Sequence, residues 1–112
     1  MTRQKPLISV ITPSYNAEEF IEKTIQSVLN QTFSDWEMII ADDCSTDGTR
    51  DILKRYEEDD ERIHAIFLKE NQGAAAARNA ALSKAEGRYV AFLDSDDAVS
   101  YTHLRAHETG RN

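Results

Sequence analysis

The chain has 112 residues and a formal net charge of −7, with 40% apolar and 29% charged residues. This composition is typical of one globular domain, or of part of a larger one, and excludes a disordered chain. The acidic excess argues against a nucleic-acid partner, because binding to a phosphate backbone needs clustered Lys and Arg.

Strands and helices alternate in the predicted secondary structure. Residues 7–12 are a short, β-branched, apolar run, typical of a strand that is covered on both faces and is ended here by Pro13. Residues 17–31 then carry an apolar stripe at helical spacing, which consists of Phe20, Ile21, Thr24, Ile25, Val28 and Leu29. Asn16 could cap this helix.

The second half of the chain continues the alternation. Residues 36–41 predict a second strand, residues 49–59 a second helix, and residues 62–68 a third strand. The Ala-rich run after residue 73 predicts a third helix that is capped by Gly87, and residues 88–93 predict a fourth strand. The order β-α-β-α-β-α-β predicts an α/β fold with a mainly parallel sheet.

Cellular location is predicted only indirectly. Cys44 is the single cysteine, so the chain has no internal disulfide, and a reducing compartment is the simpler interpretation. The sequence holds no apolar stretch near the roughly 20 residues of a membrane span, and its N-terminus lacks the pattern of a signal peptide. We expect a cytoplasmic protein, or the part of a membrane-associated longer chain that lies outside the membrane.

Polar residues follow each predicted strand. The first strand leads to Tyr15, the second to Asp42 and Asp43, the third to residues 69–73, and the fourth to the run Asp94-Ser95-Asp96-Asp97. In an open parallel sheet, ligands bind beyond the carboxyl ends of the strands. The sequence therefore predicts a binding site at this edge.

The acidic run after the fourth strand is the clearest candidate for a metal site. Crowded carboxylates repel one another unless a cation lies among them. Oxygen ligands suit Mg²⁺ or Mn²⁺, which takes one or two protein carboxylates and fills its other positions with water and phosphate oxygens. The alternative is a solvated acidic turn.

Three further features have open alternatives. Asp42 or Asp43 could accept hydrogen bonds from a nucleobase or ribose, or could cap the following turn. Tyr15 could stack on a base or pack over the sheet edge. Arg78, on the Ala-rich helix, could reach an anionic ligand or remain a solvated charge.

Two long segments resemble one protein family. VITPSYNAEEFIEKTIQSVLNQTFSDWEMIIADDCSTDGT is similar to the opening of family 2 glycosyltransferases, which are inverting enzymes with the GT-A fold, and NQGAAAARNAALSKAEGRYVAFLDSDD resembles its continuation. The motifs cover about residues 7–97 in the family's order. The resemblance implies a Rossmann-like fold, a nucleotide-diphosphate-sugar donor, with a UDP-sugar expected, and a divalent metal, Mn²⁺ or Mg²⁺.

The resemblance also implies roles for single residues. Pro13 and Tyr15 would line the nucleoside pocket, and one acid of the pair Asp42-Asp43 would contact the base. Arg78 would help to hold the nucleotide. Asp94 would lie near the ribose, and Asp96 would ligate the metal that bridges the diphosphate.

The sequence departs from the family at two places. Cys44 stands where the family usually has a small residue, which is a mild change. After residue 99 the pattern stops, so we expect residues 1–99 to be a truncated donor-binding domain and residues 100–112 a tail foreign to the family. The family's general base lies in the part expected to be missing, so none is named, and an exposed sheet edge could cause self-association.

Two alternatives from other classes remain. The first is a non-catalytic α/β module that binds a nucleotide or a partner, which would need no metal at Asp96. The second is a phosphoacceptor signalling domain, but that scheme requires an acidic pair after the first strand, where this chain has Pro-Ser-Tyr-Asn.

Overall fold

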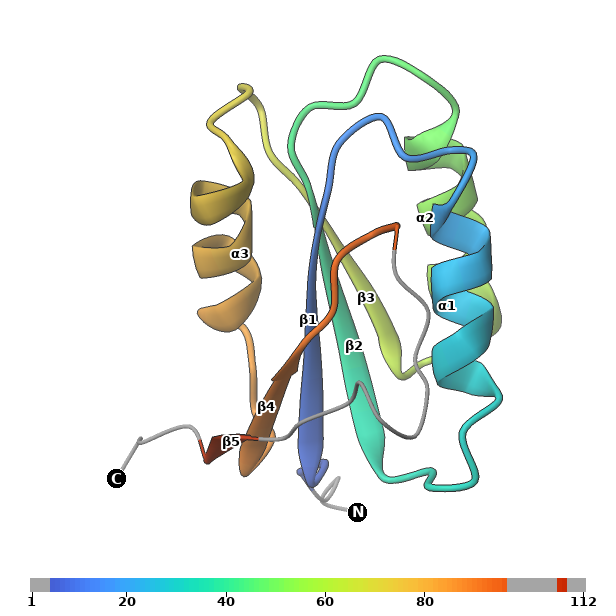
Figure 1. Ribbon diagram of the computed structural model, residues 1–112, viewed down its shortest axis with the longest axis vertical. Coiled ribbons are helices and arrows are strands. Elements are labelled where there is room, and N and C mark those ends of the chain that lie inside the picture. The colour runs from blue at the N-terminus through green and yellow to red at the C-terminus, as the bar shows by residue number, and fades with distance from the viewer. Residues whose placement is uncertain (1–4, 97–106, 109–112) are drawn as a thin grey trace.

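The computed structural model describes residues 5–96 and 107–108. The elements follow one another as β1 (Ile8–Ser14), α1 (Ile21–Leu29), β2 (Trp36–Asp42), α2 (Thr49–Asp59), β3 (Ile63–Phe67), α3 (Ala74–Leu82), β4 (Tyr89–Phe92) and β5 (His107–Glu108) (Figure 1). The predicted alternation of strands and helices is confirmed. The short β5, which was not predicted, pairs antiparallel with β4. The predicted domain boundary near residue 99, and the rest of the predicted tail, lie outside the described residues.

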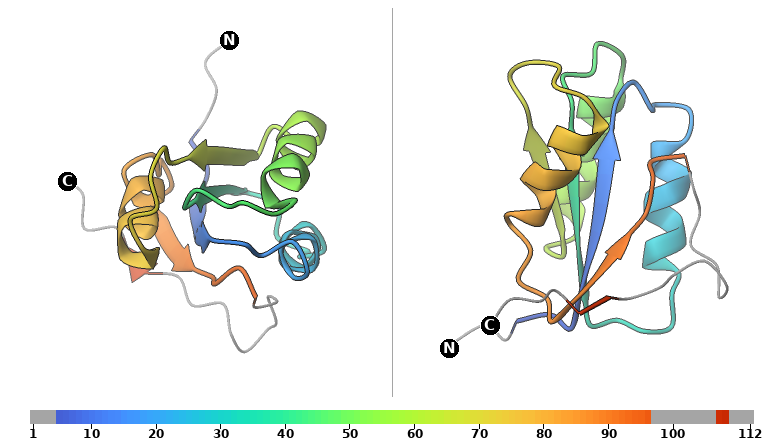
Figure 2. Two further views of the ribbon diagram at one scale, coloured as in Figure 1. Left: turned by 90° about the horizontal axis from the view of Figure 1, so that it is seen from above. Right: turned by 60° about the vertical axis from the view of Figure 1, so that its left-hand side comes forward.

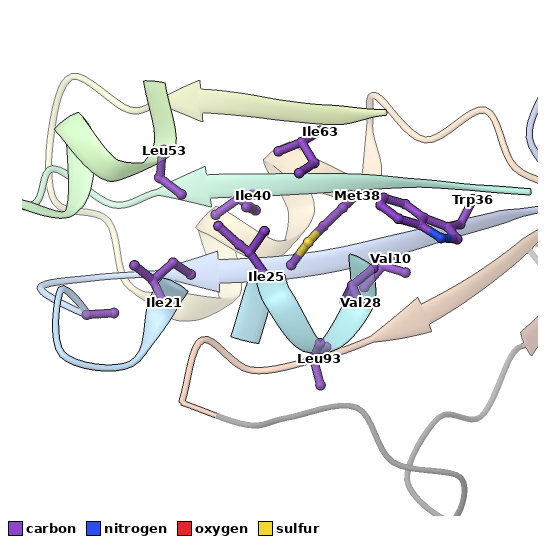
Figure 3. Close-up of a cluster of buried hydrophobic side chains, with 11 residues drawn as sticks. Val10, Ile21, Ile25, Val28, Trp36, Met38, Ile40, Leu53, Ile63 and Leu93 are labelled. Atoms are coloured by element: carbon purple, nitrogen blue, oxygen red, sulfur yellow. The ribbon is translucent and has the colours of Figure 1, made fainter. Parts of the chain in front are cut away.

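The sheet has the strand order β3-β2-β1-β4-β5, and β1 pairs in parallel with both β2 and β4. Helices α1 and α2 cover one face and α3 covers the other, so the molecule has three layers (Figure 2). Buried aliphatic side chains such as Val10, Ile25 and Met38 fill the space beneath α1 and α2 (Figure 3). Alanines of α3 pack on the opposite face, where their small side chains let this helix lie close to the sheet. No helix among the described residues is both long and apolar enough to cross a membrane.

The first strand is longer than predicted, because Pro13 does not end it. The strand continues to Ser14, which pairs with Asp42 of β2. Pairing with β4 already stops at Ile11 and Phe92. The Ile11 carbonyl accepts a hydrogen bond from the Leu93 N–H, on the side of β1 that faces β4. Residues two apart in a strand direct their backbone groups to the same side, so the backbone nitrogen of Pro13 also faces that side. The N–H that proline lacks would therefore meet no partner strand.

The start of α1 also differs from the prediction. Asn16 does not cap the helix; Phe20 occupies the N-cap position, and helical residues begin at Ile21. Asn16 has a φ of 47°, in the left-handed region that asparagine tolerates better than most residues. Its side chain binds the neighbouring β2–α2 loop instead, as described below.

The prediction that Gly87 caps α3 is wrong as well. The helix ends at Leu82, and Ser83 is its C-cap residue. Gly87 lies two residues before β4 and against β1, where its N–H donates to Ser9 Oγ at 2.8 Å. A Cβ atom at this position would come within 2.6 Å of the Ser9 backbone nitrogen. Gly87 therefore permits a close approach of two strands.

The edge of the sheet at β3 is partly covered by α2. The backbone N–H of Ala65 donates to Glu57 Oε2 at 2.8 Å, so a side chain takes the place of a further strand at this donor. At the opposite side of the sheet, β4 pairs with β5. Both contacts reduce the number of unpaired backbone groups at the sheet edges, on which the predicted self-association depends. Self-association stays a prediction.

An ion pair after α2 should make stability depend on pH. The hydrogen bond from Arg62, helped by its charge, holds the pKa of Asp60 below the ordinary 3.8. Well above pH 3.8, Asp60 is ionised in both the folded and the unfolded state, and the stabilisation from the ion pair is fully present. As the pH falls through about 3.8 towards the lower pKa of the folded state, the unfolded state takes up the proton first, and the stabilisation is lost.

We expect Asp60→Asn to lower the free energy of unfolding at neutral pH by about 1 kcal/mol or less. The variant should also lose the part of the acid dependence that comes from this group. Urea titrations of both proteins between neutral pH and about pH 3 measure the effect. Two parallel pH profiles would contradict it.

Candidate functional site

A cleft of about 640 Å³ opens at the carboxyl ends of β1 and β4. Its walls come from the β1–α1 loop, the start of α3 and the turn that follows β4. This volume lies in the range of ligand pockets. The residues proposed from the sequence that line the cleft are Pro13, Tyr15, Asp43, Arg78, Asp94 and Asp96. The residues that follow the parallel strands thus meet in one cleft, as expected from the sequence.

Tyr15 is held at the rim by the loop that follows it. The Asn16 N–H donates to Ser45 Oγ at 2.8 Å, and Asn16 Oδ1 accepts from the Thr46 N–H, also at 2.8 Å. These contacts join the β1–α1 loop to the β2–α2 loop across about 30 residues of sequence. The Tyr15 side chain remains 50% exposed, so its ring is available for stacking on a ligand.

The same two loops meet again at the start of α2. Asp47 accepts hydrogen bonds from the backbone N–H groups of Thr49 and Glu18, at 2.9 and 3.3 Å. Partial burial acts to raise the pKa of Asp47, but the hydrogen bonds from Thr49 and Glu18 outweigh it, and the pKa lies below the ordinary value. The carboxylate is therefore ionised at neutral pH and fixes the loop that carries the first wall of the cleft.

Asp42 does not line the cleft. Its side chain is fully buried on the face covered by α2, where it accepts hydrogen bonds from Arg50 Nε at 3.0 Å and from the Ser45 N–H at 2.9 Å. Arg50 also donates to the Leu68 carbonyl. Asp42 therefore caps the turn after β2, which is the alternative role that the sequence left open for it.

Asp43 faces the cleft and supports its wall. The side chains of Asp42 and Asp43 lie on opposite faces because adjacent residues of an extended chain alternate. The two carboxylate oxygens of Asp43 accept hydrogen bonds from the N–H groups of Gln72 and Gly73, each at 2.7 Å. A carboxylate oxygen accepts more than one hydrogen bond, so Asp43 can hold this turn and also contact a ligand.

Gly73 is the N-cap residue of α3, and its backbone has a conformation that only glycine adopts readily. Its φ of 95° and ψ of 163° belong to a region essentially closed to residues with a Cβ atom. Ala74 and Ala77 then line the cleft with small side chains. The result is a wall from which Arg78 projects.

Arg78 and the acidic turn face each other across the cleft. Arg78 Nη2 lies 3.9 Å from Asp94 Oδ1, and both side chains are partly exposed, at 41% and 62%. An exposed pair at this distance contributes little to stability. The guanidinium therefore keeps donors available for an anionic ligand.

The acidic turn offers a partial set of metal ligands. Asp94 and Asp96 both line the cleft, whereas Asp97 lies outside the described residues. No group of three or more His, Cys, Asp or Glu side chains in the described part of the chain is arranged to hold a metal. Two carboxylates fit a hard divalent cation whose other positions are filled by water and by ligand phosphates.

The sequence reasoning missed Phe20 as a cleft residue. Phe20 was assigned to the apolar stripe of the first helix, but it lines the cleft and its side chain is 48% exposed. Its position before the first helical residue turns it away from the core. Helical spacing alone could not reveal this, because the helix begins later than predicted.

Comparisons with known proteins agree on one family. The family model described as Glycosyl transferase family 2 matches residues 9–107. A relative from Bacillus subtilis (strain 168), the putative teichuronic acid biosynthesis glycosyltransferase TuaG, is 70% identical over 97 residues. The match covers 87% of this chain and 38% of TuaG, so the chain spans well under half the length of that relative.

Solved structures with the same fold include complexes with sugar nucleotides. S. aureus TarS 1-349 in complex with UDP-GlcNAc is 38% identical, with a TM-score of 0.79 over 84% of this chain and 28% of that one. The mannosyltransferase PcManGT from Pyrobaculum calidifontis, in complex with GDP-Man and Mn²⁺, is 31% identical, with a TM-score of 0.75 over 83% of this chain and 28% of that one.

Proposed function

The chain belongs to glycosyl transferase family 2, and from this premise we propose that it binds the nucleotide-diphosphate-sugar donor together with a divalent metal. The observation that carries the proposal is that one cleft combines an exposed aromatic ring, a buried carboxylate, a partly exposed guanidinium and two exposed carboxylates. These groups match the parts of a sugar nucleotide, which are a base, a ribose and a charged diphosphate.

The proposal gives each cleft residue a role. Tyr15, with Pro13 beside it, contacts the nucleoside, and Asp43 accepts hydrogen bonds from the base, since Asp42 does not line the cleft. Arg78 binds the nucleotide, and Asp94 lies near the ribose. This arrangement follows the walls of the cleft from the end of β1, past the start of α3, to the turn after β4.

Asp96 is the proposed metal ligand. Mn²⁺ or Mg²⁺ bound there would offset the negative charge that the leaving diphosphate develops. A cation at this turn would also account for the binding of an anion by a chain with a net charge of −7. Support comes from PcManGT, which was solved in complex with GDP-Man and Mn²⁺.

The donor is proposed to be a UDP-sugar, and the transfer is proposed to invert the anomeric centre. TarS, solved in complex with UDP-GlcNAc, supports the choice of nucleotide. Inversion requires a base that deprotonates the acceptor hydroxyl, and no residue of the described cleft is assigned to this task. We therefore propose that this chain supplies donor binding and that catalysis needs further residues of a longer protein.

Titration calorimetry with UDP and Mn²⁺ tests the proposal on the 112-residue chain. We expect binding in Mn²⁺ and an affinity at least about tenfold lower in EDTA. A folded sample that gives no binding heat would overturn the proposal. Binding that ignores EDTA would favour a non-catalytic nucleotide-binding module, and robust sugar transfer by the chain alone would overturn the need for further residues.

A further inference from the structure

Thr24 makes a polar contact that its place in the sequence does not indicate. The residue belongs to the apolar stripe of α1, and it is only 1% exposed. Its hydroxyl donates to the carbonyl oxygen of Ser95 at 2.6 Å and lies 3.2 Å from the Phe20 carbonyl of its own helix. A hydroxyl has one proton, and the shorter contact is the one to Ser95.

Ser95 stands between the two acids of the turn after β4. In Figure 1 this segment leaves β4 and runs towards α1. Before the turn, the chain is anchored by Leu93, whose N–H donates to the Ile11 carbonyl at 3.0 Å and whose side chain is buried in the core. The partly buried hydrogen bond from Thr24 adds a second anchor two residues later.

The acids themselves have weaker attachments. The Asp94 side chain is 62% exposed, and its contact with Arg78 is 3.9 Å long. Asp96 is also exposed. The direction of both carboxylates therefore depends on the backbone of the turn. This backbone is held in place by the hydrogen bond from Thr24 to the Ser95 carbonyl. Metal ligands must keep their positions to within about 0.5 Å.

We propose that Thr24 is a positioning residue for the metal-binding turn, an inference that rests on the proposed function. By fixing the Ser95 carbonyl, its hydroxyl directs the neighbouring Asp96 into the cleft, where Asp96 binds a divalent cation together with the diphosphate. Thr24 itself does not line the cleft. Its effect should therefore appear in the metal-dependent part of the affinity and leave the metal-free contacts with the nucleoside unchanged.

Thr24→Val tests this role because valine keeps the branched shape and removes the donor. We expect the affinity for UDP in Mn²⁺ to fall about tenfold, with the affinity in EDTA unchanged. Mn²⁺ binding by the UDP-loaded chain, followed by the electron paramagnetic resonance of free Mn²⁺, should weaken in parallel. Thr24→Ser restores the hydroxyl and should bring both values to within about twofold of the parent.

Thr12→Val is the matched control. Thr12 is also fully buried, it does not line the cleft, and its hydroxyl has no hydrogen-bond partner in the described part of the chain. The same substitution there should leave UDP and Mn²⁺ binding unchanged and should not lower stability, since it removes an unpaired buried hydroxyl. If Thr24→Val does not fold, Thr24→Ala removes the same donor with a smaller side chain and should give the same selective loss.

Each outcome decides between the alternatives. Unchanged Mn²⁺ dependence in Thr24→Val, or an equal loss of affinity in Mn²⁺ and in EDTA, would overturn the positioning role. Failure of Thr24→Ser to recover would overturn it as well, because the hydroxyl would then not be the cause. Failure of the parent chain to bind UDP would instead overturn the proposed function, and the role of Thr24 with it.

Discussion

Asp96→Ala is expected to lower the affinity of the chain for UDP in Mn²⁺ by about 100-fold and to remove its sensitivity to EDTA. The physical reason is that the described part of the turn after β4 offers a cation only two carboxylates, Asp94 and Asp96. Loss of one leaves a site that must be completed by water. Titration calorimetry in Mn²⁺ and in EDTA measures both effects.

The control for Asp96→Ala is a variant that removes the same charge elsewhere. Asp51 lies exposed in the first turn of α2 and does not line the cleft. Asp51→Ala should change the affinity less than about twofold, because exposed charges at a distance are screened by salt. Similar losses in both variants would show that overall charge, and not a metal at Asp96, governs binding.

Gly87→Ala is expected to lower the free energy of unfolding by about 3 kcal/mol, a large share of the stability of a small domain. The added methyl group would lie 2.6 Å from the backbone nitrogen and Oγ of Ser9 and 2.9 Å from the Ile8 carbonyl carbon. Backbone atoms inside a sheet cannot move aside as a flexible side chain can. The strands β1 and β4 would have to separate, and the midpoint of urea unfolding measures the cost.

Gly73→Ala provides the contrast. Apart from its two chain neighbours, no atom of the described residues lies within 4 Å of the position that its Cβ would take, so the cost comes only from the φ of 95°. We expect a loss of about 1–2 kcal/mol. Because the Gly73 N–H binds Asp43, this variant should also weaken UDP binding, whereas Gly87→Ala should retain its affinity once folded. An unchanged midpoint for Gly87→Ala would contradict the packing argument.

Much of the fold could be predicted because its signals are local. Buried parallel strands are continuous apolar runs, and the helix over residues 49–59 has the predicted bounds. The resemblance to family 2 glycosyltransferases is confirmed by the match to residues 9–107, and the Rossmann-like GT-A architecture by the likeness to TarS. Once the strands alternate with helices, handedness and parallel pairing bring their carboxyl ends to one edge.

The failed predictions concern contacts between distant parts of the chain. Asn16 has the side chain of a helix cap, but its partners are Ser45 and Thr46, about 30 residues away. Gly87 follows a helix as a cap would, but Ser9 on another strand determines its identity. Local patterns identify residues that can cap or turn, and the tertiary structure decides which partner they take.

The pair Asp42-Asp43 illustrates the same limit within the site. Both residues are acidic, both are nearly or fully buried, and both accept hydrogen bonds from backbone N–H groups. The two residues differ only in the face of the sheet to which their side chains are directed. That face depends on the register between β2 and its neighbouring strands. Thr24 is a similar case. The role of its hydroxyl can be recognised only in the tertiary structure, where the turn after β4 lies beside α1 and Ser95 accepts its hydrogen bond.

The hydrogen bonds that join the loops around the cleft also affect the thermodynamics of binding. Asn16 connects the first loop to the second, and Asp43 connects the end of β2 to the turn before α3. The conformational entropy of these segments is therefore lost during folding and not when a ligand arrives. A preorganised cleft of this kind should bind its nucleotide with little change in amide hydrogen exchange across these loops, and mutations that break their connections should raise the entropic cost of binding.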